Sequence, residues 1–414
     1  MKRNNLIITL RHIARNKINS VLNIAGIALG TAAILLILEY ISTEKSYNLF
    51  HTDKDQMYRL IYSNPEGSAW PEMEPGIGPL LKERLPAVAA YCRYEIGIAQ
   101  GVVKVNNPAA DPFRESAIGY ADGNFFSFFS FPVKMGKAAA LNEPFSCFLS
   151  EKAAAKYFQD QNPVGQTILL YNQFGEGSFR IGGIYTIPEN SDIQYDIVFS
   201  LATFNVPSYL KENDWAAIHN LSSQYIQTML KLAPGYSPHE LEKQINTIRH
   251  SVIPGNDGTV LHLQPLTQMH LPKTFADSYP TFGNLRYICI LGLVAILILC
   301  MAWFNYINLS TAQAIKRSNP TGICKVIGTS RNSLVGLYLT ESIAINLLGL
   351  SFAIILIYLV QPLFNSLVQK ELSLTSIKWN NVTLIGSVIF VSGVLLSGWY
   401  TAAHANPVGA LKSE

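Results

Sequence analysis

Four long uncharged runs of apolar residues interrupt an otherwise mixed sequence of 414 residues. Their apolar cores begin near residues 21, 287, 342 and 382. Because about 20 apolar residues of helix cross the hydrocarbon core of a bilayer, each run is long enough to span a membrane. The pattern predicts a membrane protein with four transmembrane α-helices, at residues 18–42, 284–310, 334–360 and 381–402.

The first apolar run follows basic residues, as the core of a secretory signal peptide does. Its apolar core, residues 21–38, is longer than the usual core of such a peptide. We therefore expect an uncleaved membrane anchor.

Residues 43–283, between the first and second spans, have the composition of a water-soluble domain, with most of the charged residues and prolines. Runs rich in β-forming residues alternate with amphipathic helical patterns, two of which begin at the capping residues Ser150 and Ser237. We expect a large extracytoplasmic α/β or α+β domain. Its strands are predicted near residues 56–63, 179–187, 195–201, 225–232 and 259–266, and its helices near 77–86, 150–158 and 237–253, the last with Leu241, Ile245 and Ile248 on one face.

Basic residues indicate which ends of the spans face the cytoplasm, because Lys and Arg accumulate on that side. The N-terminal segment 1–17 and the loop 311–333 are the basic ones. We therefore expect both termini, including the tail 403–414, in the cytoplasm, and the loop 361–380 outside with the large domain. The basic residues are Lys2, Arg3, Arg11, Arg15 and Lys17 before the first span, and Lys316, Arg317, Lys325 and Arg331 between the second and third.

Charged residues make up 14% of the chain and hydrophobic residues 49%, as in a membrane protein, and a net charge of +3 is too small to indicate nucleic-acid binding. No GxxxxGK[ST] sequence occurs, and His239-Glu240 lacks the second histidine of an HExxH zinc site. His262 and His270 are more typical of structural histidines than of metal ligands. We expect no catalytic residues, no metal and no cofactor bound by this chain.

Only two of the five cysteines, Cys92 and Cys147, fall in the expected external domain, where a disulfide is permitted. Two buried free thiols are the interpretation that we favour.

The loop between the second and third spans contains a short helical pattern. Asn319 can cap a helix that begins at Pro320, and Gly328 can end it. The residues alone leave two interpretations open: a helix that contacts a cytoplasmic partner, or a helix that lies on the lipid surface. Its apolar face, at i, i+3, i+4 spacing, consists of Ile323, Val326 and Ile327.

Small residues recur along the first span at Gly26, Gly30 and Ala33, where they allow another helix to approach closely. They are candidates for helix packing or for a dimer interface. Near the ends of two spans, Glu39 and Glu341 can reach water, so we favour a structural role over a proton relay.

Several segments, in order along the chain, carry a resemblance to a known family: LNIAGIALGTA, EKSYNLFH, YADGNFFSFFSFPVKMGKAAAL, LSEKAAAKYF, NPVGQTI, IPENSDIQYDIVFS, LHLQPLTQMHL, FNYINLSTAQAIKR, KVIGTSRNSLVGLYLTES and NPVGALK. With these the chain resembles the permeases related to the macrolide exporter MacB and the division protein FtsX, the mechanotransmitting ABC transporters. The resemblance covers nearly the whole chain.

The resemblance implies an N-terminal span, a MacB-like periplasmic core domain of two lobes and three further spans in the bacterial inner membrane. It also implies a homodimer or heterodimer that pairs with a separate cytoplasmic ABC ATPase, which binds the ATP and Mg²⁺. That ATPase would grip the loop helix, and this favours coupling as the role of the helix. The residues selected for this ATPase-coupling helix are Pro320, Gly322, Ile323, Lys325, Val326, Ile327 and Gly328.

Two departures from the family pattern stand out. Pro320-Thr321-Gly322 occurs where a Glu usually precedes Ile-Gly, and Cys324 occurs where Arg is frequent. In addition, some relatives fuse two such halves into one eight-span chain, so this chain is either a natural half-size subunit or a shortened form.

The expected function is that of a permease subunit that converts ATP-driven motion of its partner into conformational change in the periplasm. Export of antimicrobial peptides or antibiotics, or defence against them, is the first expectation. The alternatives are a periplasmic sensor or scaffold that is tethered to the membrane and uncoupled from an ATPase, and a relative that releases lipoproteins or regulates a hydrolase. Further contacts are expected with membrane lipid and with a periplasmic partner, and none with nucleic acid.

Overall fold

A computed structural model of the protein describes residues 15, 17–95, 97–107, 111–159, 161–253, 258–274, 283–316 and 331–373. The chain divides into two compact units. The helical unit is Met1–Lys45 with Arg286–Glu414, and the sheet unit is Ser46–Leu285. The expected fourth span at 381–402 and the tail at 403–414 lie outside the described residues.

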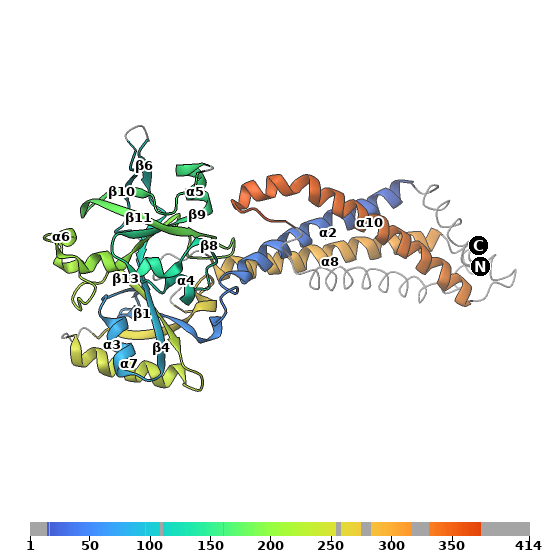
Figure 1. Ribbon diagram of the computed structural model, residues 1–414. Coiled ribbons are helices and arrows are strands. Elements are labelled where there is room, and N and C mark those ends of the chain that lie inside the picture. The colour runs from blue at the N-terminus through green and yellow to red at the C-terminus, as the bar shows by residue number, and fades with distance from the viewer. Residues whose placement is uncertain are drawn as a thin grey trace, which may run out of the picture. The chain divides into compact units, whose positions relative to one another are not determined.

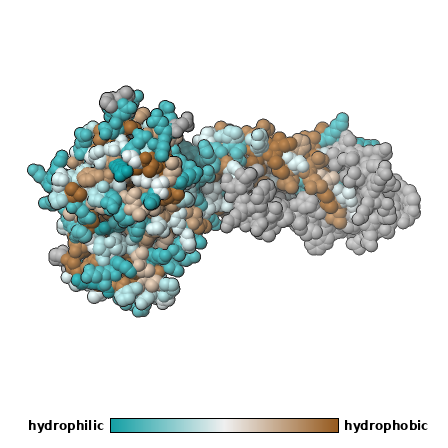
Figure 2. Space-filling view, in the orientation of Figure 1, coloured by the Kyte–Doolittle hydropathy of each residue, from teal (hydrophilic) through white to brown (hydrophobic). Residues whose placement is uncertain are grey.

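The described part of the helical unit consists of α2 (Lys17–Ser46), α8 (Leu285–Lys316) and α10 (Arg331–Val368). Each contains a stretch long and apolar enough to cross a membrane, at Ser20–Ser46, Leu285–Asn305 and Leu339–Val368. Three of the four expected spans are therefore confirmed. Figure 1 shows these helices side by side, and Figure 2 shows the hydrophobic surface along them.

Contacts between α2 and α10 are tight. Apolar side chains of the two helices form one buried cluster, and a Cβ atom on Gly349 would lie 2.9 Å from the Cβ of Ile27. Glycine at 349 is what lets the two backbones approach at this point. The cluster contains Ala32, Leu35 and Leu36 of α2 and Ala353 and Ile357 of α10.

α10 continues through Pro362 to Val368, so the first part of the expected external loop 361–380 is helical. Two polar residues in this extension, Gln361 and Asn365, bond to each other and to the chain that follows the helix. These bonds use the amide N–H groups of both side chains, and they hold the last turns of α10 beyond residue 360.

The strands of the sheet unit are β1 (Met57–Ser63), β2 (Ala69–Trp70), β3 (Glu72–Met73), β4 (Val88–Tyr94), β5 (Gly101–Val105), β6 (Phe113–Glu115), β7 (Ile118–Ala121), β8 (Val133–Gly136), β9 (Ser146–Ser150), β10 (Thr167–Asn172), β11 (Gly175–Tyr185), β12 (Ile197–Ser200), β13 (Ile226–Leu232) and β14 (Val260–Pro265). Its α-helices are α3 (Ile77–Arg84), α4 (Phe125–Phe128), α5 (Glu151–Phe158), α6 (Pro207–Leu210) and α7 (Pro238–Val252). Short 3₁₀ turns lie at Lys54–Gln56, Ala138–Asn142, Leu201–Asn205, Asp214–Ala216 and Leu266–Gln268.

The described strands form one mixed sheet in the order β14-β1-β13-β4-β7-β12-β9-β11-β10-β5-β6, and the remaining three pair at its sides, β2 with β1, β3 with β13 and β8 with β11. β7 with β12 and β9 with β11 are parallel pairs, and the other pairs are antiparallel. Helices α3 and α7 contact each other and cover the strands at one end of this order (Figure 1). The fold is therefore the mixed α/β domain that the sequence predicts between the first two spans.

Three buried clusters fill the sheet unit. One lies under α3 and α7 and includes Leu60 and Leu230, and a second at the other end of the sheet includes Ile168 and Phe179. Between them lies an aromatic cluster supplied largely by the segment FFSFFSF. Aromatic rings bury large apolar areas, so this segment contributes strongly to the core. The cluster includes Phe125, Phe126, Phe129, Phe131, Phe148, Tyr185 and Tyr195.

The sheet is narrowest between β4 and β7, where one residue pair, Tyr94 with Ala121, joins the two strands. Side chains support this waist. Arg93 forms a buried ion pair with Asp122 at 2.8 Å and donates two further bonds to backbone carbonyls. The adjacent Glu95 carboxylate accepts backbone N–H bonds at 2.9, 3.0 and 3.1 Å, one of them from Tyr120 of β7. Burial nevertheless raises the pKa of Glu95 to about 7.

Each strand and helix predicted for the domain is present at its expected place. Ser150 accepts the backbone N–H of Ala153 at 3.0 Å, which confirms it as a helix cap. Ser237 also precedes its helix, but its side chain makes no capping bond, so that part of the prediction is wrong. Cys92 and Cys147 are buried free thiols, and no disulfide joins them.

Candidate functional site

The residues selected for ATPase coupling, from Pro320 to Gly328, lie outside the described residues, and their role stays a prediction. The first-span residues are described. A Cβ atom on Gly26 would lie 2.8 Å from Asn305 Nδ2 of α8, and one on Gly30 would lie 3.3 Å from the Cβ of Ala302. Glycine therefore allows α2 and α8 to approach closely. Ala33 is half-buried, and a dimer interface at these residues stays a prediction.

Asp192 lies where three segments of the sheet unit meet. The first, residues 46–51, follows α2 in the chain. The second is the loop between β11 and β12, which carries Asp192 itself. The third, around His270 and Gly283, precedes α8. We call this meeting point the Asp192 junction, and it consists of Tyr47, Asn48, Asp192, His270 and Gly283.

Both oxygens of the Asp192 carboxylate are used. Asn48 Nδ2 donates to Oδ2 at 2.7 Å, and His270 Nδ1 lies 2.5 Å from Oδ1. The backbone N–H of Asp192 donates in turn to Asn48 Oδ1 at 3.1 Å. All three side chains are buried. Since hydrogen bonds to a buried carboxylate are among the stronger ones in proteins, this one group holds the first and third segments together.

Asn48 is well suited to its place because its backbone has a φ of 59°, in the left-handed region that Asn tolerates better than most residues. Its N–H donates to the carbonyl of Asn190 at 2.8 Å. Asn190 Nδ2 donates back to the carbonyl of Ser46 at 2.9 Å. The chain that follows α2 is thus fixed to the β11–β12 loop by backbone and side-chain bonds.

The third segment closes over the junction. The ring of Tyr47 stacks on that of His270, with centroids 3.7 Å apart. The N–H of Gly283 donates to the carbonyl of His270 at 3.1 Å. A Cβ atom at position 283 would lie 2.8 Å from His270 Nε2, so a glycine fits where a larger residue would displace the ring.

His51, at the end of the first segment, contacts the aromatic cluster. Its Nδ1 lies 2.5 Å from the carbonyl oxygen of Phe129, and its ring contacts those of Phe50 and Phe131. Burial lowers the pKa of His51 to about 4, although the Phe129 carbonyl and the Asp192 charge act in the opposite direction. His51 is therefore neutral at neutral pH, and its Nδ1–H donates to Phe129.

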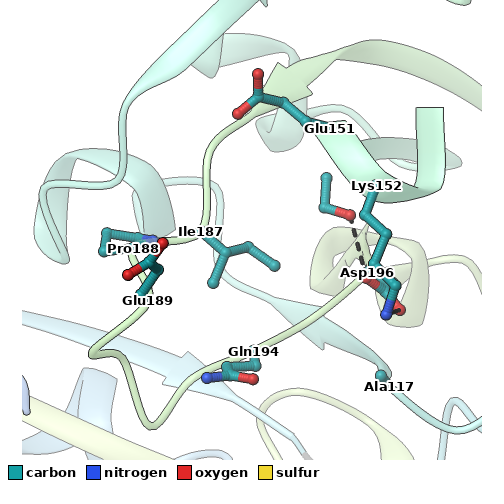
Figure 3. Close-up of a pocket in the computed structure, with 9 residues that line it drawn as sticks. Ala117, Glu151, Lys152, Ile187, Pro188, Glu189, Gln194 and Asp196 are labelled. Atoms are coloured by element: carbon teal, nitrogen blue, oxygen red, sulfur yellow. Dashed lines mark hydrogen bonds and ion pairs between the residues drawn. The ribbon is translucent and has the colours of Figure 1, made fainter. Parts of the chain in front are cut away.

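A cavity of about 360 Å³ opens between the N-terminus of α5 and the same β11–β12 loop. Figure 3 shows Ile187 between Pro188 and Glu189 on one side and Lys152 and Asp196 on the other. Ser150 Oγ donates to Asp196 at 3.1 Å, and Lys152 lies 3.8 Å from it. The cavity is partly open to solvent and has a mixed polar and apolar lining, and the loop that forms one wall also carries Asp192.

The Asp192 junction holds three segments of the sheet unit together. In the described part of the chain no group of three or more His, Cys, Asp or Glu side chains could hold a metal ion. The segment that follows α2 and the segment that precedes α8 both bond to the Asp192 carboxylate. Sequence reasoning missed these contacts, although three of the segments that carried the family resemblance, EKSYNLFH, IPENSDIQYDIVFS and LHLQPLTQMHL, contain Asn48, Asp192 and His270.

Comparison with protein families gives two matches. The MacB-like periplasmic core domain matches residues 20–248, more than half of the chain, and the FtsX-like permease C-terminal domain matches residues 292–406. No curated protein matches this chain in sequence.

Three solved structures are similar. A domain of a permease protein from Porphyromonas gingivalis is 18% identical with a TM-score of 0.43, over 52% of this chain and 92% of that one. The periplasmic region of MacB from Actinobacillus actinomycetemcomitans is 16% identical with a TM-score of 0.36, over 50% and 87%. The extracellular domain of the noncanonic ABC-type transporter YknZ from Gram-positive bacteria is 10% identical with a TM-score of 0.34, over 50% and 98%.

The first match covers the first span and most of the sheet unit, and the second covers the C-terminal part of the chain, in the order that the resemblance implied. This multi-pass membrane protein therefore belongs to the ABC permease family whose members join a MacB-like periplasmic core domain to an FtsX-like permease C-terminal domain.

Proposed function

We propose that this chain is the permease subunit of an ABC-type system and couples a separate cytoplasmic ATPase to conformational change in the periplasm. Family membership implies the ATPase partner. The observation that carries the proposal is the Asp192 junction. A rigid connection transmits a displacement that a flexible one would absorb. The segment that follows α2 and the segment that precedes α8 are both bonded to the buried Asp192 carboxylate.

The remaining parts of the proposal rest on the basic residues and on the family resemblance. We propose that both termini lie in the cytoplasm and the main domain in the periplasm, because the basic residues cluster in segment 1–17 and loop 311–333. Two copies of this chain, or this chain and a related permease, pair with the ATPase, which binds ATP and Mg²⁺. The loop helix with Ile323, Val326 and Ile327 is the surface that the ATPase grips.

Co-expression with the P-loop ATPase encoded nearest to this chain tests the coupling. We expect the ATPase to co-purify in detergent and to hydrolyse ATP faster in proteoliposomes that contain this chain. Ile323→Asp should abolish both effects, because it puts a charge on the apolar face of the loop helix, while Ser318→Ala in the same loop should leave them unchanged. A wild-type chain that neither retains nor stimulates an ATPase would contradict the proposal.

A second candidate, a membrane-tethered periplasmic sensor or scaffold, is favoured by the departures at Pro320 and Cys324. It predicts that no ATPase co-purifies and that Pro320→Glu changes nothing. The permease proposal predicts that Pro320→Glu maintains or strengthens the stimulation.

We propose first that the transported substrates are antimicrobial peptides or antibiotics. A strain that lacks this chain should then become more susceptible to such compounds, and the wild-type gene, but not the Ile323→Asp variant, should restore resistance. Unchanged susceptibility with mislocalised lipoproteins or altered hydrolase activity would assign the chain to the other branches of the family.

A further inference from the structure

The chain reverses direction directly after α10. Gln369 has a φ of 54°, which ends the helix, and Leu372 is buried with 4% of its surface exposed. The carbonyl of Leu372 accepts bonds from Asn365 Nδ2 at 2.9 Å and from Gln361 Nε2 at 3.2 Å. Residues 369–372, which we call the α10 hook, are therefore fixed to the last turns of α10.

The hook carries a lysine that is aimed at α2. Lys370 Nζ forms an ion pair with Glu44 and also lies 5.7 Å from the centroid of the Tyr40 ring. The Glu44 side chain is 2% exposed and that of Lys370 25% exposed, so the pair is largely removed from solvent. One turn nearer the middle of α2, Glu39 is fully buried and accepts a bond from Gln361 Nε2 at 3.2 Å.

These polar contacts have a different mechanical character from the rest of the α2–α10 interface. The other contacts that we describe between the helices are apolar, in the cluster that contains Leu36 and Ile357, and apolar contacts are not directional. A buried ion pair favours a narrow range of geometries, because separating the two charges loses their attraction in a poorly solvated place. The pair of Glu44 and Lys370 therefore fixes the register of α10 against α2.

We propose that Glu44 and Lys370, supported by Glu39 and Gln361, form a tether through which α10 moves α2. The inference rests on the proposed function. In the chain, α10 directly follows the loop that contains the proposed ATPase-coupling helix, and α2 leads directly to Tyr47 and Asn48 of the Asp192 junction. The tether thus completes a route for displacement from that loop to the sheet unit, and these four residues are positioning residues that bind no substrate.

Cross-linking tests the tether without any ATPase. Ala32 of α2 and Ala353 of α10 are small residues of the same buried cluster, so cysteines introduced by Ala32→Cys and Ala353→Cys add little bulk and should form a disulfide when the register is native. The measurement is the rate of this cross-link in membranes under mild oxidation. Chains with only one of the two substitutions control for reaction of the native cysteines.

We expect Glu44→Gln and Lys370→Met each to slow the cross-link on the order of fivefold or more, because each leaves a charge without its partner. The exchanged pair, Glu44→Lys with Lys370→Glu, should return the rate to within about twofold of wild type. A matched control is the exposed pair of Lys134 and Glu151, whose side chains are 57% and 44% exposed. Lys134→Met and Glu151→Gln should have no effect, since exposed pairs contribute little.

The reconstituted complex then separates failure of the tether from failure of the proposed function. If the wild-type chain stimulates its ATPase, Glu44→Gln and Lys370→Met should reduce the stimulation and the exchanged pair should restore it. The tether is overturned if both single variants cross-link at the wild-type rate, or if the exchanged pair cross-links no faster than the single variants. Either result leaves the permease proposal intact. A wild-type chain without any stimulation would overturn the proposed function, and the cross-linking result would still decide the register.

Discussion

Asp192 shows what one buried carboxylate can do when its partners come from distant parts of a chain. Asn48 lies 144 residues away in the sequence and His270 lies 78 residues away. A family resemblance marks the segments that contain these residues, yet nothing in a segment indicates which other segment it touches. The residue types were therefore available from the sequence, and their convergence required the fold.

Removal of the Asp192 charge should destabilise the sheet unit. Asp192→Asn cannot accept at both oxygens, so it should lower the free energy of unfolding by about 2–4 kcal/mol. Thermal unfolding of the purified full chain in detergent measures the change. Glu189→Gln, an exposed carboxylate in the same loop, is the control and should stay within about 0.5 kcal/mol of wild type. Equal stability of the two variants would show that the junction is not a strong contact.

His51 should make stability depend on pH. Burial lowers its pKa from 6.5 to about 4, so below pH 6.5 the unfolded chain binds a proton that the folded chain excludes. The stabilising contribution is complete above about pH 6.5 and is lost as the pH falls toward 4. Melting temperatures of wild type and His51→Gln should therefore converge as the buffer is changed from pH 7.5 to 4.5.

Glu95 gives the opposite slope, because its pKa is raised to about 7 and the folded state holds the proton more tightly than the unfolded state. That contribution is common to wild type and His51→Gln and cancels in the difference between them. Parallel melting curves for the two proteins across this range would contradict the assignment to His51.

At the scale of elements, hydropathy locates helices better than it locates their ends. The apolar run predicts the third span to residue 360, whereas α10 continues through Gln361 and Asn365 to Val368. Polar amides at that point look like the start of a loop, but in the structure they bond to each other, to Glu39 of α2 and to the carbonyl of Leu372 on the returning chain. The two predicted helix caps also differ. The Ser150 side chain accepts a bond from the first turn of its helix, whereas the Ser237 side chain makes no such bond.

The close approach of α2 to α8 can be tested with two glycines. Gly30→Leu should destabilise the helical unit by about 1–3 kcal/mol, because its Cβ would already lie 3.3 Å from the Cβ of Ala302. Gly292→Leu on α8 is the matched control, since a Cβ there meets no described atom within 4 Å. Resistance to thermal aggregation in detergent measures both. If the two variants aggregate at the same temperature, Gly30 is not a packing residue.

For the whole molecule, the sequence predicts the order of units and three of the spans that the structure confirms, because hydrophobic length and charge are local properties. It predicts individual strands for the same reason. It does not predict that β1 pairs with β14, which lies about two hundred residues later, or that the sheet narrows between β4 and β7. Those features depend on contacts between distant segments.

The pairing of β1 with β14 also bears on how such proteins diversify. The first and last strands of the sheet unit, β1 and β14, are neighbours, with Leu60 opposite Leu263. The start of the first strand and the end of the last strand therefore lie side by side. A different domain whose two ends also lie side by side is the kind that fits between the same two connections. One membrane frame can in this way acquire new external modules by simple exchange, and chimaeras made at these two points are a practical route to reprogramming the permease.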